Sequence, residues 1–210
     1  MLARVFNATD PHPLRSAAAY ADMPALQKQI EKNKKNLDAA DMAGMTALLY
    51  AVQNGHEEAA VLLMFHGAKA DVKNQSGQTP LMFACENCLS GATEKILQQN
   101  VPLDTQDVIS GDTALIKACR AGHGWAACRL VAAGADMDAE NKKGETAEML
   151  ARENLDARDF ILFTGAVRTQ RNAAADAAAA EARRAQDAAT TLQRDIIPLN
   201  VVKLHPRRPK

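Results

Sequence analysis

The chain has 210 residues, of which 47% are hydrophobic but only 4% aromatic, and alanine is abundant. This composition allows one or two domains and favours thin, closely packed helices over one large globular core. The 25 basic and 25 acidic residues give a formal net charge of zero, which excludes a general affinity for nucleic acid or acidic membranes. Because no apolar run reaches about 18 residues, we expect no membrane span.

Residues 1–13 are predicted to form an extended arm, since they contain Pro11 and Pro13 and show no hydrophobic periodicity. A secretory signal is not expected, because the segment has no clear apolar stretch. Arg4 and Arg15 enclose a single early acid, so a mitochondrial presequence is an alternative interpretation. Cytoplasm or nucleus is the default location.

From Leu14 onward the sequence predicts two short helices separated by a turn near residues 22–24. Leu26 and Ile30 lie one turn apart on the second helix, and Pro24 fits its first turn. This unit lacks the Gly-x-Thr motif of the units that follow, and its second helix ends in polar residues. Such a polar unit is expected at the end of a stacked array, where one side faces water.

Four later segments repeat one pattern of glycine, threonine and alanine. The glycines recur at intervals of 33, 34 and 33 residues, and the threonines and alanines keep step with them: Gly44, Gly77, Gly111 and Gly144; Thr46, Thr79, Thr113 and Thr146; Ala51, Ala84, Ala118 and Ala151. A fixed period of this length is typical of a stacked array of helical repeats.

The repeated motif resembles the ankyrin repeat. The resemblance is carried by Gly-Met-Thr-Ala-Leu-Leu-Tyr-Ala at 44–51, Gly-Gln-Thr-Pro-Leu-Met-Phe-Ala at 77–84, Asn-Gly-His at 54–56 and His-Gly-Ala at 66–68. About five repeats are present, of which the second, third and fourth match well. The resemblance implies an all-α solenoid of helix-turn-helix units with β-turn fingers over residues 14–165. It also implies a protein-binding scaffold without catalytic activity.

The middle repeats depart from this pattern at particular turns. Cys88 stands where the neighbouring repeats have Gly55 and Gly122, and Asn100 replaces the glycine that closes the third repeat. Asparagine is the best non-glycine residue for a left-handed cap. The fourth repeat has one extra residue at 107–110, which is expected to lengthen its finger. The histidine that usually follows the leucine of the motif is replaced throughout: Leu49, Met82, Ile116 and Met149.

The pattern weakens in the fifth repeat and then stops. Glu148 takes the place of the buried leucine, and Gly165 is expected to end the second helix. Residues 166–195 are predicted to form one long helix, because eleven of the nineteen residues at 172–190 are alanine. Without a heptad seam, this helix is not expected to form a coiled coil by itself. Residues 196–210 contain four basic residues and no acid, which predicts an extended basic tail.

The repeat register indicates which side chains a protein partner would contact on the concave surface. These candidates lie two positions after the leucine of the motif and just before the turn glycine: Tyr50, Gln53, Phe83, Glu86, Asn87, Lys117 and Arg120. Tyrosine and arginine are enriched among residues that dominate binding. Alternatively, Tyr50 and Phe83 only cover neighbouring helices. Trp125 falls at a normally exposed outer-helix position, so we expect the long helix or a partner to cover it.

No pattern in the sequence indicates catalysis, a cofactor or a metal ion. The Cys85-x-x-Cys88 spacing suggests zinc, but the register places the cysteines at separate packed or turn positions, so four thiolates are not expected to converge. Reduced cysteines favour an intracellular location. His56 and His123 belong to turns and are expected to be structural. No arrangement of serine, histidine and carboxylate, and no glycine-rich phosphate loop, suggests an enzyme.

Three functional hypotheses remain open at this stage. The first is a permanent subunit of a larger assembly, with partners on the concave surface and along the long helix. The second is a regulatory adaptor that binds one protein reversibly. The third is a nucleic-acid-associated protein that uses the basic tail, although this tail has no aromatic residue for base stacking.

Overall fold

A computed structural model of the chain describes residues 12–33 and 36–196. Within these ranges all regular structure is α-helical, and the only bridge between extended residues is an isolated one from Glu140 to Thr146. The predicted all-α class is therefore confirmed. Most of the predicted N-terminal arm and nearly all of the predicted basic tail lie outside the described residues.

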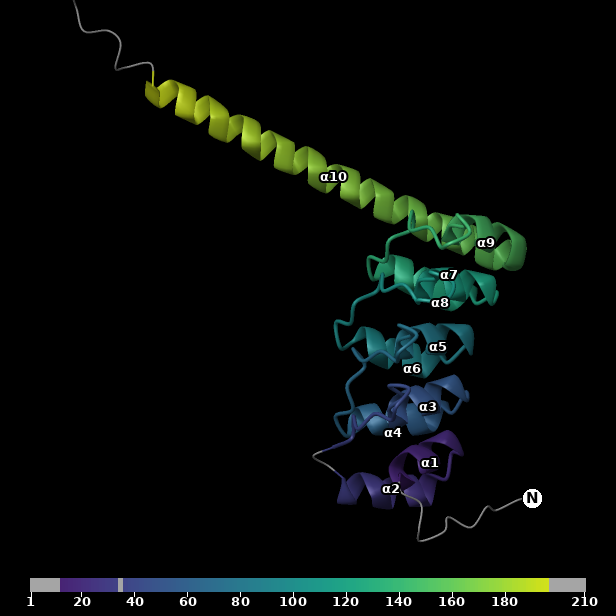
Figure 1. Cartoon of the computed structure of the whole chain (residues 1–210). Coiled ribbons are helices and arrows are strands. Elements are labelled where there is room, and N and C mark those ends of the chain that lie inside the picture. The colour runs from purple at the N-terminus through teal and green to yellow at the C-terminus, as the bar shows by residue number, and fades with distance from the viewer. Residues whose placement is uncertain (1–11, 34–35, 197–210) are drawn as a thin grey trace, which may run out of the picture. The chain divides into compact units, whose positions relative to one another are not determined.

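The helices up to residue 167 form pairs that stack in sequence order (Figure 1). The first helix of each pair packs against the first helix of the next pair. The pairs are α1 (Pro13–Ala19) with α2 (Met23–Lys32), α3 (Ala47–Gln53) with α4 (Glu57–Phe65), α5 (Pro80–Glu86) with α6 (Ser90–Leu97), α7 (Ala114–Arg120) with α8 (Gly124–Ala132), and α9 (Ala147–Asn154) with the start of α10 (Ala157–Ile196).

A threonine begins the first helix of each repeat from the second to the fifth. Each threonine has an extended backbone, and its hydroxyl accepts a hydrogen bond from the amide three residues later. The distances are 3.2, 3.3, 3.3 and 3.4 Å for the pairs Thr46–Leu49, Thr79–Met82, Thr113–Ile116 and Thr146–Met149. Such N-caps each contribute about 1 kcal/mol, which explains why threonine recurs with the period of the array.

In the first four repeats, the turn between the two helices contains a left-handed residue. Gly55 and Gly122 have φ of 76° and 75°, and the equivalent residues Ala21 and Cys88 have φ of 53° and 58°. Asn100 is also left-handed, with φ of 51°, so the interpretation of Cys88 and Asn100 as replacements for turn glycines is confirmed. A side chain in this conformation costs about 1–2 kcal/mol.

The core of the stack consists of leucines next to small residues. Leu48, Leu81 and Leu115 are 1% exposed, and the alanines three positions later on the same helices are fully buried. Because alanine has no side chain beyond Cβ, neighbouring first helices can approach closely, and the sequence needs few aromatic residues to fill the core.

A backbone hydrogen bond joins the two ends of each finger between repeats. Asp41 N–H donates to Met45 O, and Asn141 N–H donates to Glu145 O, across five residues. In the fourth repeat Asp107 N–H donates to Asp112 O, so the loop has six residues and the predicted lengthening is confirmed. Backbone bonds also join successive fingers: Gln75 to Ala43, Val108 to Ser76 and Lys142 to Ser110, at 2.8–2.9 Å.

The fifth repeat ends the stack with a polar surface. Glu148 and Arg152 replace a leucine and a small apolar residue of the earlier repeats, and their side chains form an i,i+4 ion pair at 3.9 Å. The expectation that Gly165 ends a helix is wrong, since α10 continues through it. A glycine inside a helix costs only about 1 kcal/mol, which the surrounding helix-forming residues outweigh. The predicted alanine-rich helix lies within α10.

Candidate protein-binding surface

The exposed side chains of the first helices form a row across the repeats. Gln53, Glu86, Arg120 and Glu153 occupy the same position in α3, α5, α7 and α9, and all four are exposed. Because these helices pack in order, the row continues from one repeat to the next. We call these four residues the inner-helix row.

Tyr50 lies one turn before Gln53 on α3 and is held in place by the finger. Its hydroxyl donates a hydrogen bond of 2.7 Å to Asp41 Oδ2. This bond raises the pKa of Tyr50 and lowers the pKa of Asp41. The phenol is half-buried, with its polar end bound to the finger of its own repeat.

Phe83 differs from Tyr50, although the two positions are equivalent. Its side chain is 6% exposed and belongs to the core. The structure therefore favours the alternative for Phe83, in which the ring covers neighbouring helices. Of the two aromatic residues expected on the concave surface, only Tyr50 is therefore accessible to a partner.

Lys117 links the third and fourth repeats. Its Nζ lies 3.4 Å from Glu86 Oε2 and 3.6 Å from Asp107 Oδ2. Burial raises the pKa of Asp107, but hydrogen bonds from Ser110 and the charge of Lys117 outweigh this effect and leave the pKa below its usual value. The ammonium group of Lys117 is thus mostly engaged within the stack, and its side chain is only 10% exposed.

Arg120 links the fourth and fifth repeats. Its guanidinium binds both carboxylate oxygens of Asp112, and Nη2 lies 3.0 Å from Glu145 Oε2. Asn141 Nδ2 donates to Asp112 Oδ1 at 2.9 Å. Burial raises the pKa of Asp112, but the hydrogen bonds from Arg120 and Asn141 reverse the direction, so the carboxyl stays ionised. Our sequence reasoning missed Asp112, although its place at the end of the lengthened finger is a signal that it contacts the next repeat.

Asn87 also joins repeats. Its Nδ2 donates to the carbonyl oxygens of Val52 and Gln53 at 2.9 and 3.1 Å, near the C-terminus of α3. The amide therefore satisfies helix-end carbonyls that have no partner within their own helix. Asn87 is exposed but has a structural role, whereas Gln53 presents its side chain to solvent.

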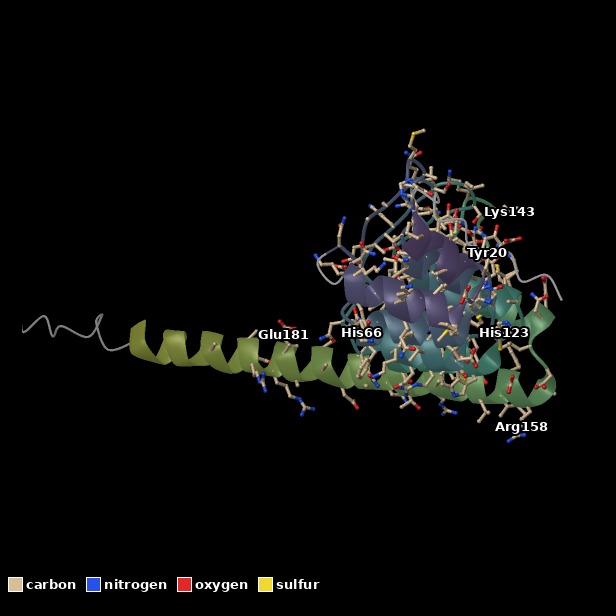
Figure 2. All side chains as sticks on the ribbon, turned by 90° about the horizontal axis from the view of Figure 1, so that it is seen from below. Tyr20, His66, His123, Lys143, Arg158 and Glu181 are labelled. Carbon is tan, nitrogen blue, oxygen red and sulfur yellow. The ribbon has the colours of Figure 1, made fainter. Side chains whose placement is uncertain are left out.

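The outer turns carry the two histidines, and Trp125 lies in the first turn of α8. His56 Nε2 lies 3.0 Å from Ala19 O and His123 Nε2 lies 3.3 Å from Glu86 O, so each ring contacts the preceding repeat and the expected structural role is confirmed. Figure 2 shows His66, at the C-terminus of α4, and His123, at the start of α8, near opposite ends of the helix pairs. Trp125 is 47% exposed, so its expected covering is absent from the described residues.

Residues 14–107 match the family described as ankyrin repeats, in three copies. These residues are ankyrin repeats. The match begins with the first repeat, which the sequence had suggested to be degenerate, and ends at the start of the fourth. The later ankyrin repeats keep the same threonine caps and finger hydrogen bonds. Ankyrin repeats are protein–protein interaction domains.

Several known proteins resemble these ankyrin repeats over part of their length. The B-cell lymphoma 3 protein homolog of Mus musculus is 33% identical over 62% of this chain and 29% of its own length. SH3 and multiple ankyrin repeat domains protein 2 of Homo sapiens is 31% identical over 78% of this chain and 9% of its own. "Probable E3 ubiquitin-protein ligase XBOS32" of Oryza sativa subsp. japonica is 33% identical over 57% of this chain and 24% of its own length. The chain thus spans less than a third of each of these relatives.

The cysteines of the ankyrin repeats are free thiols in different environments. Cys85 and Cys119 are buried, and burial raises the pKa of each thiol to about 12. Cys88 is exposed and Cys128 is partly buried. In the described part of the chain, no three histidine, cysteine or acidic side chains gather as a metal ion would require. None of the described helices is both long and apolar enough to cross a membrane.

Proposed function

We propose that this chain binds a protein partner through the inner-helix row, with Tyr50 and Lys117 beside it. The observation that supports the proposal is the alignment of Gln53, Glu86, Arg120 and Glu153 at one position of successive helices, all exposed. From the second repeat to the fifth, the side chains of this row are neutral, acidic, basic and acidic. A partner with complementary charges would be selected by its electrostatic pattern more than by apolar burial.

The ion pairs of the row make it a rigid surface. Arg120 is held between Asp112 and Glu145, and Glu86 is held by Lys117. Because these side chains are already ordered, a partner that contacts them loses less conformational entropy on binding. This preorganisation is a reason to expect selective binding from a polar surface.

We further propose that the protein is a non-catalytic subunit of a larger assembly. The long α10 offers a second surface, since an alanine-rich helix lets another helix or surface approach closely. The alternative is a reversible regulatory adaptor that uses only the repeats. Buried free thiols at Cys85 and Cys119 are compatible with a reducing compartment, and we propose the cytoplasm or nucleus as the location.

The proposal is tested by comparing surface variants of the full chain in affinity purification at two salt concentrations. The variant Gln53→Arg with Glu153→Arg changes the inner-helix row at positions that form no ion pair among the described side chains. The control is Lys95→Glu on α6, an exposed position of a second helix. We expect the double variant to lose the proteins retained by both wild type and control. Equal retention by all three would contradict the inner-helix row as the binding surface.

A further inference from the structure

The outer turns of the third, fourth and fifth repeats enclose an open depression of about 510 Å³. Cys88, Ser90 and Thr93 line it from the third repeat, His123 and Trp125 from the fourth, and Asp159 from the fifth. This volume lies within the range of about 300–1,000 Å³ of typical ligand sites. The depression is separate from the inner-helix row, because it is built on the turns into the second helices and on the second helices themselves.

Two of these side chains, Trp125 and Asp159, can both attract a cation. Trp125 is 47% exposed, and the face of an indole ring is the most favourable aromatic partner for a cation. Asp159 brings a carboxylate to the same depression, and in the described structure this carboxylate forms no ion pair. Arg129, on the same helix as Trp125, is already bound to Glu94 at 2.8 Å.

Asp159 is held in this position by the backbone of α8. A Cβ atom at Gly124 would lie only 2.4 Å from Cβ, Cγ and Oδ2 of Asp159. The aspartate therefore occupies the space that any other residue at position 124 would fill. Its own N–H donates to Asp156 Oδ1 at 2.7 Å, which fixes the first turn of α10. The carboxylate is thus placed by packing and not by a cationic partner.

We propose that this depression binds an arginine side chain of a partner protein, with the guanidinium stacked on Trp125 and paired with Asp159. Arginine fits both contacts better than lysine, because its planar group stacks on aromatic faces and binds carboxylates through two parallel N–H groups. The proposal does not depend on the inner-helix row. It defines a second contact, built on the second helices and the turns that lead into them.

The test uses the full chain and the peptide acetyl-Gly-Leu-Arg-Leu-Gly-amide, with the same peptide containing neutral citrulline as its matched control. Trp125 is the only tryptophan, so its fluorescence reports this site directly, and calorimetry measures the affinity of variants that lack it. We expect saturable binding of the arginine peptide and a loss of about tenfold or more in affinity with citrulline.

The variants Trp125→Leu and Asp159→Asn are each expected to weaken binding of the arginine peptide about three- to tenfold. Phe65→Leu removes an aromatic residue that is 76% exposed elsewhere and should leave binding unchanged. Equal affinity for the citrulline peptide, or no saturable binding up to about 5 mM, would overturn the proposal. The peptide comparison uses the unaltered chain, so it remains decisive if a variant fails to fold. Loss of this binding leaves the inner-helix row untouched, so the two proposals fail separately.

Discussion

Arg120 Nη2 lies 3.0 Å from Asp112 Oδ1, and this contact joins a first helix to the only six-residue finger among those described. Asp112 is 1% exposed, and its second hydrogen-bonding partner, Asn141, belongs to the next finger. The extra residue of the fourth repeat therefore comes with a buried acid whose charge is balanced by a residue of the inner-helix row. A change at Arg120 therefore affects both the stability of the repeats and the charge of the inner-helix row.

Removal of Arg120 should strongly destabilise the repeats. Arg120→Ala leaves the buried carboxylate of Asp112 without its cation, and we expect a loss of about 2–4 kcal/mol in the free energy of unfolding. Urea denaturation followed by circular dichroism measures this loss. The matched control is Arg129→Ala, whose ion pair with Glu94 is exposed on both sides and should contribute about 1 kcal/mol or less. Equal losses in both variants would contradict the buried role of Asp112.

The finger carboxylates should make the stability depend on pH in acid. The pKa values of Asp41, Asp107 and Asp112 are all lowered from the usual 3.8 in the folded chain. A lowered folded pKa means that the stabilisation is complete above pH 3.8 and is lost as the pH falls through the folded values. Unfolding free energies measured from pH 6 down to about pH 2 should therefore fall below about pH 4. Asp112→Asn should flatten this fall, and an unchanged slope would show that Asp112 does not contribute.

Replacement of Cys88 by glycine should stabilise the third repeat. Cys88 has φ of 58°, in the conformation for which its neighbours use glycine, and its side chain is exposed. Cys88→Gly removes the strain of a left-handed side chain, and we expect a gain of about 1 kcal/mol. Thermal unfolding detects the change as a higher Tm. Cys128→Ala, at a residue inside α8, should give no such gain. A lower Tm for Cys88→Gly would show that its side chain contributes more than the strain costs.

Alanine at two helical glycines should have opposite effects. At Gly124 the added methyl group meets Asp159 at 2.4 Å, so Gly124→Ala should destabilise the contact of α8 with α10 by about 1–3 kcal/mol. At Gly165 nothing lies within 4 Å of the added group, and Gly165→Ala should stabilise α10 by up to about 1 kcal/mol. Thermal melts of both variants test the pair. A Gly124→Ala chain as stable as wild type would remove the argument for the position of Asp159.

Features that depend on the repeat register were predictable from the sequence. The left-handed turns and the lengthened finger follow from residue type and spacing, and the structure confirms them. The sequence showed that the threonines recur, and the structure adds that they cap the first helices. The burial of Phe83 was not predictable, because Phe83 and Tyr50 occupy the same position in their repeats. Their different exposed fractions depend on how the neighbouring helices pack. The prediction that Gly165 ends a helix failed because one glycine does not set a helix boundary when the residues on both sides favour the helix. The ion pairs of Lys117 and Arg120 were missed because they join a first helix to its own finger or to a neighbouring repeat, and the register of one repeat does not show these contacts.

Binding of the chain into a larger assembly is tested most directly by sedimentation of the tagged protein in a native extract at moderate salt, compared with the purified chain. We expect the extract protein to migrate with much larger material, and Gln53→Arg with Glu153→Arg to return it to the position of the purified chain. Migration of the wild-type protein at the position of the purified chain would contradict a permanent subunit. Migration of the double variant with the large material would contradict binding through the inner-helix row.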